Sequence, residues 1–247
     1  HTSNGMICSA KELGMGDDHS GIIVLPKGSA SPGDDAIELL QIVDTIFDVA
    51  VNPDRGYALS IRGIAREVAA SLGLAFSDPA SAAAKISLNG TGAPVEIKLT
   101  SGGMVAFLRT MENFDTSASS PLWMRRRIEK CGMRSISLAV DVTNYVMLEL
   151  GQPLHAFDAD HIDSFLEIRR AGSVQKFTTL DGQERTLDPD DLVVSDSKKV
   201  LALAGTMGGL ESEITDSTKR IALEAVRFDQ IAVAKNSRRH KLSTEAS

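Results

Sequence analysis

The chain has 247 residues, of which 43% are hydrophobic and 24% charged, and its formal net charge is -7. A chain of this length can bury one large or two modest hydrophobic cores, so it needs neither disulfides nor metal ions to fold. No apolar run approaches the roughly 20 residues that cross a bilayer, which excludes a membrane-spanning protein. The acidic balance gives no general attraction to nucleic acid, so any RNA contact has to use local basic patches.

The two cysteines, Cys8 and Cys131, are far apart in the sequence and form no CxxC pair. This spacing favours a reducing compartment over a disulfide scaffold or a zinc site, and we expect a cytoplasmic protein. The chain begins at His1 rather than at methionine and stops at Ser247 in a polar, helix-like stretch. We therefore expect both ends to be cut from a longer protein.

The first part of the chain carries weak signals of regular structure. Residues 1–27 are rich in Gly, Ser and Asp, and only 21–26 resembles a strand. In residues 44–51, apolar side chains alternate with others, which predicts a half-buried strand.

An amphipathic helix is predicted directly after Ser60. Apolar residues recur at helical spacing from Ile61 to Leu72, and Gly73 suits a left-handed C-cap. From residue 77 to 92 the composition shifts to Ser, Asp, Pro, Ala and Gly, which indicates a linker. We expect a domain boundary there.

The remainder of the chain mixes helical and strand signals. A helix is expected at 121–131 with Leu122, Met124 and Ile128 facing inward, and another after Asp229. Further segments are an apolar run at 140–150, a hairpin at 177–187 around Asp181-Gly182, and β-rich runs at 192–195, 200–204 and 221–226. Because no regular βαβ alternation appears, the sequence predicts a mixed-sheet α+β domain rather than a doubly wound fold.

One candidate functional segment runs from Gly151 to Asp158 and is polar and turn-rich. Its His155 is either a functional side chain or a histidine that hydrogen-bonds Asp158 within its own loop. Neither HExxH nor paired Cys/His spacing occurs, so a zinc hydrolase is not expected.

A second candidate is the glycine-rich segment 205–209, which follows a predicted strand. Its backbone could approach a ligand and offer N–H groups, or it could simply form a tight turn. It matches neither nucleotide-binding glycine pattern, so a nucleotide cradle is not favoured.

Glu224 lies inside the apolar run 221–226, on the same face as Ala222 and Val226 if that run is a strand. If that face is buried, the carboxylate needs a partner such as Arg227, Arg134 or a ligand hydroxyl. At a sheet edge it would only be solvated.

The basic runs 125–127 and 238–241 could contact phosphates or form solvated helix faces. The serine-hydrolase pattern GxSxG is absent, and neither cysteine has a histidine near it in the sequence. Any hydrolysis is therefore expected to use a positioned water molecule.

These segments, in their order along the chain, resemble the beta subunit of bacterial phenylalanyl-tRNA synthetase. Residues 3–14 are similar to the tail of that subunit's inserted tRNA-binding OB-fold, and 52–67 to the signature of its small flanking domain. The most specific motif is VDVTNYVMLELGQPLHAFD at 140–158, and the similarity continues to residue 247. The resemblance implies an OB-fold remnant at 1–27, a small α/β flanking domain with its linker at 28–92, and a mixed-sheet editing domain at 93–247.

The resemblance implies an editing pocket that hydrolyses tyrosine wrongly attached to tRNA(Phe). The residues that match the family's pocket are Arg134, His155, Gly208, Glu224, Thr244 and Ala246. His155 and Thr244 are expected to be catalytic and the other four to bind substrate. The sequence departs from the family at Gly102-Gly103-Met104, and at Lys241, where relatives usually have glycine.

The resemblance also implies that the chain is part of a phenylalanine–tRNA ligase. The intact enzyme attaches phenylalanine to tRNA(Phe) with ATP and Mg²⁺, and its partners are tRNA(Phe) and an alpha subunit in an alpha-beta heterotetramer. No cofactor is expected to bind this part of it. The alternative is a non-catalytic module that docks tRNA or the partner subunit.

Overall fold

The computed structural model describes residues 5–16, 19–25, 27–83 and 96–244. The chain divides into two compact units, one comprising His1–Ala50 and Glu129–Arg134 and the other Val51–Ile128 and Ser135–Ser247. Helices occur together with parallel and antiparallel strands, so the predicted α+β class with a mixed sheet is confirmed. The three-part division at residues 27 and 92 stays a prediction.

The first unit consists mainly of turns and irregular segments. Among its described residues, one short helix occurs, α1 (Ala36–Leu39), in which the Asp35 carboxylate accepts a hydrogen bond from the Ile37 N–H. The strands predicted at 21–26 and 44–51 are wrong, because the described residues of both segments form no strand. Alternating apolar residues form a strand only where a neighbouring strand pairs with their N–H and C=O groups.

The second unit begins with the 3₁₀ helix η1 (Pro53–Ala58) and helix α2 (Ile61–Leu72). The predicted caps of α2 are confirmed: the Ser60 hydroxyl accepts from the Gly63 N–H at 3.1 Å, and Gly73 ends the helix with φ 64°. A Cβ at Gly63 would lie 1.9 Å from the Tyr57 carbonyl oxygen, so glycine is required where η1 packs on α2. A further short helix, α3, follows at Ala80–Ala83.

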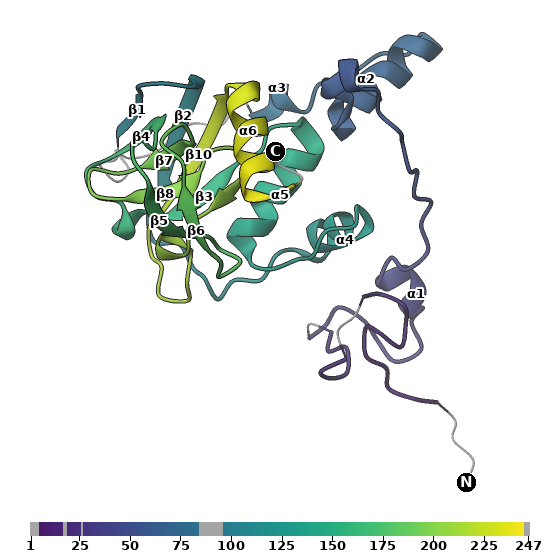
Figure 1. The fold of residues 1–247 in the computed structure, drawn as a ribbon. Coiled ribbons are helices and arrows are strands. Elements are labelled where there is room, and N and C mark those ends of the chain that lie inside the picture. Colours follow the sequence, from purple (N-terminus) through teal and green to yellow (C-terminus); the bar gives the residue numbers. More distant parts are fainter. Residues whose placement is uncertain (1–4, 17–18, 26, 84–95, 245–247) are drawn as a thin grey trace. The chain divides into compact units, whose positions relative to one another are not determined.

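Two sheets form the centre of the second unit (Figure 1). The larger has the strand order β1-β4-β7-β8-β9, in which β1 is parallel to β4 and the other pairs are antiparallel. The smaller is antiparallel, with the order β2-β10-β3. The strands of the larger sheet are β1 (Glu96–Leu99), β4 (Phe165–Arg170), β7 (Leu192–Ser195), β8 (Val200–Leu203) and β9 (Met207–Gly208). Those of the smaller are β2 (Gly103–Met111), β3 (His155–Asp158) and β10 (Ile221–Phe228).

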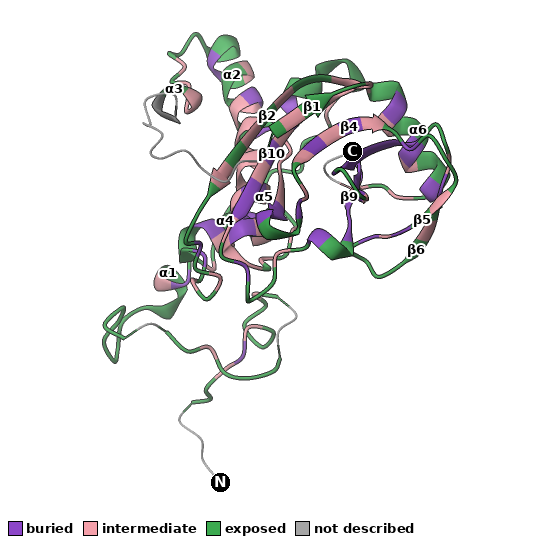
Figure 2. Cartoon of the chain, turned by 90° about the vertical axis from the view of Figure 1, so that its left-hand side faces the viewer, coloured by how far each residue is buried: buried purple, intermediate pink, exposed green. Residues whose placement is uncertain are grey.

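The main hydrophobic core is shared by these two sheets. Buried side chains of β4, β7 and β8 pack with those of β3 and β10, and the cluster includes Phe157, Leu166, Ile168, Leu192 and Leu201. The predicted hairpin is confirmed as β5 (Gln175–Thr178) and β6 (Glu184–Leu187), which pack on the other side chains of β7 and β8. Strands β7 and β8 are therefore buried on both faces. Buried residues also lie along β10, as the purple segments in Figure 2 show.

Two helices, α4 (Leu122–Lys130) and α5 (Leu138–Leu150), lie between β2 and β3 in the chain. Helix α5 contributes Ala139 to a small core with Ile221, on the outer side of the three-stranded sheet. Helix α4 buries Met124 and Ile128 as predicted. The inward position predicted for Leu122 is wrong, since it lies in the first turn and is 37% exposed. Short 3₁₀ turns occur at η2 (Ala159–His161) and η3 (Leu210–Ser212).

Helix α6 (Gln230–His240) follows β10 directly, and the predicted cap is confirmed because the Asp229 carboxylate accepts from the Ala232 N–H. Its Asn236 is fully buried and exchanges two hydrogen bonds with the backbone of Leu192, accepting from the N–H at 3.1 Å and donating to the carbonyl at 2.7 Å. The helix ends at Lys241, which takes a left-handed conformation with φ 52°. Helix and sheet are thus joined by a buried side-chain amide.

Candidate functional site

A cavity of about 1280 Å³ lies in the second unit. Its walls come from the segment 151–155, from β8, β9 and β10, from one face of α6, and from residues 243–244 that follow this helix. Four of the six predicted pocket residues line it, namely His155, Gly208, Glu224 and Thr244. These four residues, of which His155 and Thr244 are 89 positions apart in the sequence, therefore meet at one cavity, as the prediction requires.

Glu224 is the most unusual side chain of this cavity. It lies in β10, the central strand of the three-stranded sheet, opposite Leu108 on one side and His155 on the other. The residue is only 4% exposed, which rules out the solvated sheet edge. Within the described part of the chain its carboxylate has no hydrogen-bond or ion-pair partner, so the arginine partners considered from the sequence do not pair with it.

Burial without a partner changes the acidity of this group. Loss of solvation disfavours the ionised form and raises the pKa of Glu224 from 4.5 to about 7. Near neutral pH, the carboxyl group is therefore present in both protonation states. In either state it can accept a hydrogen bond from a hydroxyl group that enters the cavity.

His155 lies in β3 directly opposite Glu224, so both side chains are on the same face of the sheet. Its ring meets Phe157 edge to face, with 4.4 Å between the centroids. The alternative of a histidine bonded to Asp158 in a loop is wrong: His155 is in a strand, and the Asp158 carboxylate accepts from the Thr218 hydroxyl at 2.6 Å. Burial lowers the pKa of His155 from 6.5 to about 4, so its imidazole is neutral at pH 7.

Gly208 makes room for that imidazole. A Cβ at this position would lie 2.4 Å from Cε1 and 2.7 Å from Nε2 of His155, closer than atoms can approach without moving. The glycine-rich segment is thus a turn at Gly205, with φ 62°, followed by the short strand β9. The turn between strands is confirmed, whereas contact of its backbone with a ligand stays a prediction, although the segment lines the cavity.

Thr244 lies in the segment that follows α6, and its hydroxyl donates to the Thr206 carbonyl at 3.2 Å. Ala246, predicted beside it, lies outside the described residues. Arg134 belongs to the first unit, is exposed, and is not among the residues that line the cavity. The structure therefore tests neither Ala246 nor a role of Arg134 with the other four.

Sequence reasoning misses the wall formed by α6. The cavity residues on this helix are Gln230, Val233, Ala234, Ser237 and Arg238, which follow the three-and-four spacing of a single helix face. The spacing was visible in the sequence, but it looks like any helix face that packs on a core. Only the fold, which brings this face of α6 to the same cavity as β10, identifies it as a cavity wall.

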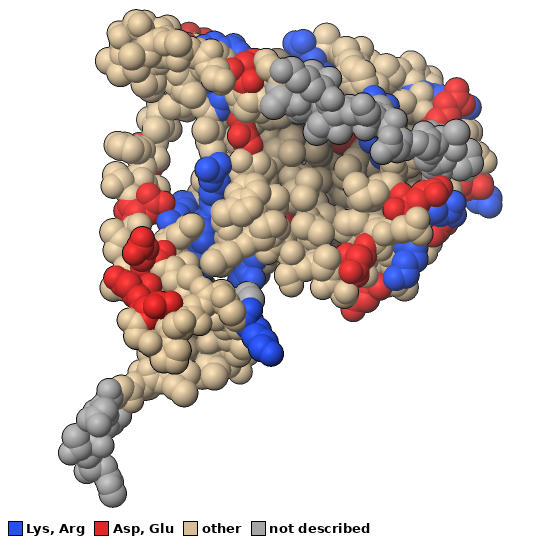
Figure 3. Space-filling model, turned by 180° about the vertical axis from the view of Figure 1, so that it is seen from behind, with Lys and Arg blue, Asp and Glu red and all other residues tan. Residues whose placement is uncertain are grey.

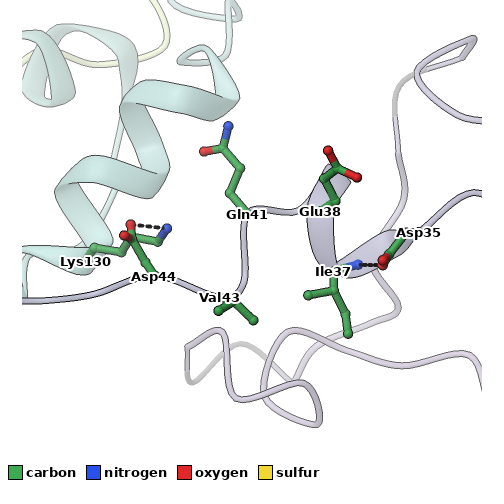
Figure 4. A pocket seen from close by; sticks show the side chains of 7 residues that line it. All are labelled: Asp35, Ile37, Glu38, Gln41, Val43, Asp44 and Lys130. Atoms are coloured by element: carbon green, nitrogen blue, oxygen red, sulfur yellow. Dashed lines mark hydrogen bonds and ion pairs between the residues drawn. The ribbon is translucent and has the colours of Figure 1, made fainter.

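A smaller hollow of about 490 Å³ occurs in the first unit (Figure 4). Lys130 forms an ion pair with Asp44 at 2.7 Å, which lowers the pKa of that carboxyl, and Asp35 caps α1. The remaining polar side chains of this hollow, Glu38 and Gln41, are exposed, so its described residues include no buried carboxylate comparable to that of the larger cavity.

Other kinds of site are not formed by the described residues. No group of three or more His, Cys, Asp or Glu side chains there is arranged to hold a metal ion. None of the helices described is both long enough and apolar enough to span a bilayer. Cys8 and Cys131, both within the described ranges, are not joined in a disulfide.

Comparison with known families decides what this fold is. Residues 103–247 match the family model of the B3/4 domain. The chain belongs to the B3/4 domain family. This region contains both strands that carry Glu224 and His155, together with β9 and α6.

The whole chain is also similar to the phenylalanine–tRNA ligase beta subunits of two bacteria. It is 54% identical over 250 residues to that of Streptomyces avermitilis, covering 100% of this chain and 30% of the relative. It is 51% identical over 245 residues to that of Thermobifida fusca, covering 99% of this chain and 29% of the relative. The resemblance inferred from the motifs is confirmed, and the chain spans less than a third of these relatives' length.

A solved structure with a related description is the N-terminal fragment of the phenylalanyl-tRNA synthetase beta-subunit from Pyrococcus horikoshii. The match covers 76% of this chain and 59% of that chain, with 13% sequence identity and a TM-score of 0.43.

Proposed function

We propose that this chain is the part of a phenylalanine–tRNA ligase beta subunit that hydrolyses tyrosine wrongly esterified to tRNA(Phe). The observation that supports it best is Glu224, a buried carboxylate without a partner on the wall of a large cavity. Such a group costs several kcal/mol to bury and is retained where a ligand supplies the missing hydrogen bond. The names of the similar proteins agree with this substrate class.

The need for such a site follows from the limits of binding selectivity. A pocket shaped for phenylalanine rejects tyrosine weakly, because tyrosine adds only one hydroxyl group. A second pocket that contains a hydrogen-bond acceptor reverses the preference. Tyrosine satisfies Glu224 through its phenol hydroxyl, whereas phenylalanine leaves the carboxyl group desolvated and unpaired, at a cost of about 1–3 kcal/mol or more for the charged form.

Hydrolysis in this cavity uses a positioned water molecule. The water oxygen forms a bond to the ester carbonyl carbon, the bond to the ribose oxygen breaks, and that oxygen leaves with a proton from the water. The neutral imidazole of His155 has one nitrogen free to accept a hydrogen bond from this water, and Gly208 fixes the ring. The Thr244 hydroxyl and backbone N–H groups near Gly208 orient the carbonyl group.

For Arg134 and Ala246 we propose only what the family resemblance implies, that they bind the aminoacyl ester. We further propose that the complete protein acts with an alpha subunit and tRNA(Phe) in the cytoplasm. Synthesis of the correct aminoacyl-tRNA with ATP and Mg²⁺ then belongs to regions other than these residues.

The test is hydrolysis by a catalytic amount of the chain. Tyrosyl-tRNA(Phe) and phenylalanyl-tRNA(Phe) are supplied separately, and release of the amino acid is followed over time. We expect selective release of tyrosine. The Glu224→Ala variant should lose most of the selectivity, roughly 5-fold to 150-fold by the hydrogen-bond energies above, and His155→Ala should lose the rate.

Glu213→Ala is the matched control, because Glu213 is exposed and outside the cavity. It should leave both rate and selectivity unchanged. Protection of the ester by excess chain, without turnover, would instead establish the non-catalytic docking module. An unchanged selectivity in Glu224→Ala would refute the role of that carboxylate.

A further inference from the structure

Among the residues that the structure describes, the side chain of Arg238 on α6 lacks the hydrogen-bond and ion-pair partners that the adjacent residues of the helix have. Ser237 donates to the Leu242 carbonyl, and Arg239 and His240 both contact the carboxylate of Asp191. Arg238 lies between them, on the face that lines the cavity, and is exposed. Its guanidinium has no hydrogen-bond or ion-pair partner anywhere in the described ranges.

Some arginines of the same unit are neutralised by acids: Arg169, Arg185 and Arg220 each form an ion pair with a carboxylate. On the face seen in Figure 3, acidic and basic side chains of this unit are interspersed. Two arginines, Arg227 and Arg238, line the cavity without an ion-pair partner among the described residues, and of these only Arg238 lies on α6. An uncompensated arginine on a cavity wall is a place for a ligand anion.

The size of the cavity indicates what that ligand contains. Pockets for drug-sized ligands measure about 300–1,000 Å³, and the value here, about 1280 Å³, is larger. An amino acid alone would leave most of this space empty. There is room for the nucleoside that carries the ester as well as for the amino acid.

We infer that Arg238 binds a phosphate group next to the 3′-terminal nucleoside of the RNA whose ester enters the cavity. The inference rests on the proposed function and deepens it by assigning a phosphate contact to α6. A guanidinium suits this role because it donates two parallel hydrogen bonds to phosphate oxygens and stays charged at every relevant pH. The paired neighbours Arg239 and His240 hold the last turn of the helix, so Arg238 is presented from a fixed backbone.

The test compares a substrate with phosphates and one without. Tyrosyl-tRNA(Phe) contains the phosphate group in question, whereas adenosine esterified with tyrosine at its ribose contains none. Arg238→Gln should lower kcat/KM for tyrosyl-tRNA(Phe) by roughly 10-fold to 100-fold, the range of a charge-assisted hydrogen bond. For tyrosyl-adenosine it should change the value by less than about 2-fold.

Lys235→Gln is the matched control, since it removes the same charge from the same helix at an exposed position that does not line the cavity. It should leave kcat/KM unchanged for both substrates. Equal losses on both substrates in Arg238→Gln would overturn the inference, because Arg238 would then act on the fold or on the amino-acid end. No loss on either substrate would also overturn it.

A separate measurement distinguishes this inference from the proposed function. If the unmodified chain hydrolyses neither ester, the proposed function fails, and binding of a single-stranded RNA oligonucleotide still tests Arg238. The logarithm of its Kd is followed against the logarithm of salt concentration. Arg238→Gln should reduce that slope by about 0.7, the value for one phosphate contact, and an unchanged slope would refute the contact.

Discussion

Two acid–histidine pairs of the second unit occupy buried surroundings and differ in every other respect. Asp191 and His240 are 0% and 9% exposed, and their side chains are 2.7 Å apart. Asp191 also accepts from the Asp188 N–H and pairs with Arg239. Glu224 and His155 face the same cavity from neighbouring strands, and neither side chain has a hydrogen-bond partner in the part of the chain that the structure describes.

The two pairs differ in what surrounds the carboxylate. A buried carboxylate surrounded by donors is stabilised, and losing one donor is costly. A buried carboxylate without donors destabilises the fold and shifts its pKa instead, as for Glu224. Proteins retain such a group where it acts on a ligand, so the comparison supports the proposal that the cavity is the site, with the Asp191 cluster in a structural role.

The largest expected effect comes from the supporting cluster. Asp191→Ala removes the buried carboxylate that His240 and Arg239 share, which leaves the His240 ring without this partner and, among the described residues, Arg239 with only its longer contact to Asp188. We expect the free energy of unfolding, measured with urea, to fall by about 3–5 kcal/mol. Asp190→Ala, at the exposed neighbouring residue, should change it by less than about 0.5 kcal/mol. Similar losses in both variants would contradict a structural role specific to Asp191.

Glu224→Gln should increase the free energy of unfolding rather than decrease it, by an amount that depends on pH. Because the folded-state pKa of Glu224 is about 7 rather than 4.5, the folded protein keeps a proton that the unfolded chain loses between these values. The protonated group's contribution is therefore complete below pH 4.5 and is lost as the pH rises to about 7. The neutral glutamine should leave stability unchanged near pH 4.5 and raise it by up to about 3 kcal/mol at pH 8.

The same variant exposes the contribution of His155. Its folded-state pKa is lowered to about 4, so stability is present above pH 6.5 and is lost as the pH falls toward 4. In the unmodified protein this slope opposes that of Glu224 between about pH 4.5 and 6.5. The free energy of unfolding, measured with urea across this pH range, should be nearly constant for the unmodified chain and should fall on acidification in Glu224→Gln. Parallel curves for the two proteins would contradict the opposing contributions of Glu224 and His155.

Gly208→Ala tests whether the backbone of β9 fixes the imidazole. The added methyl group would overlap the His155 ring, and the ring must move. We expect a loss of about 1–3 kcal/mol in stability, and a pKa of His155 closer to its ordinary value, measured by NMR titration of the ring proton on Cε1. Gly21→Ala is the control, because no atom lies within 4 Å of its added Cβ. An unchanged titration curve would show that Gly208 does not hold the ring.

The smallest effect is expected at Lys241, which ends α6 in a left-handed conformation with φ 52°. Glycine adopts this conformation without the strain of a Cβ, so Lys241→Gly should raise stability by about 0.5–1 kcal/mol. Asn113→Gly, at a φ of 56°, should gain less, because asparagine tolerates this region better than lysine. A loss of stability at Lys241 would mean that its side chain does more than end the helix.

The parts of the fold that were predictable have local signals. The caps of α2 and α6, the hairpin turn at Asp181-Gly182 and the apolar strands β7, β8 and β10 are all determined by residues close in the sequence. The missed strands β1, β2, β3 and β4 pair with partners far away in the chain. Their regularity comes from that pairing, which a local pattern does not contain.

In the site, too, some features follow from the local sequence pattern and others only from pairing with distant strands. The pattern of residues 221–226 places Glu224 on the face of Ala222 and Val226, as the structure confirms. That β10 is a central strand, and that His155 lies opposite Glu224, follows only from the strand order. The family resemblance supplied His155, Gly208 and Thr244. The physical pattern alone left His155 and the segment of Gly208 with an ordinary structural alternative and gave no signal for Thr244.

The side-chain amide of Asn236 makes detachment of α6, which forms one wall of the cavity, measurable. The Leu192 N–H donates to this amide, whereas the Leu192 carbonyl accepts from the amide and also from the Ala204 N–H, so the Leu192 N–H is protected only while α6 is docked. Hydrogen exchange at this single amide therefore measures the free energy of detaching the helix. An occupant bridging the sheet and the helix would slow that exchange in proportion to its affinity, which turns one backbone proton into a reporter of occupancy.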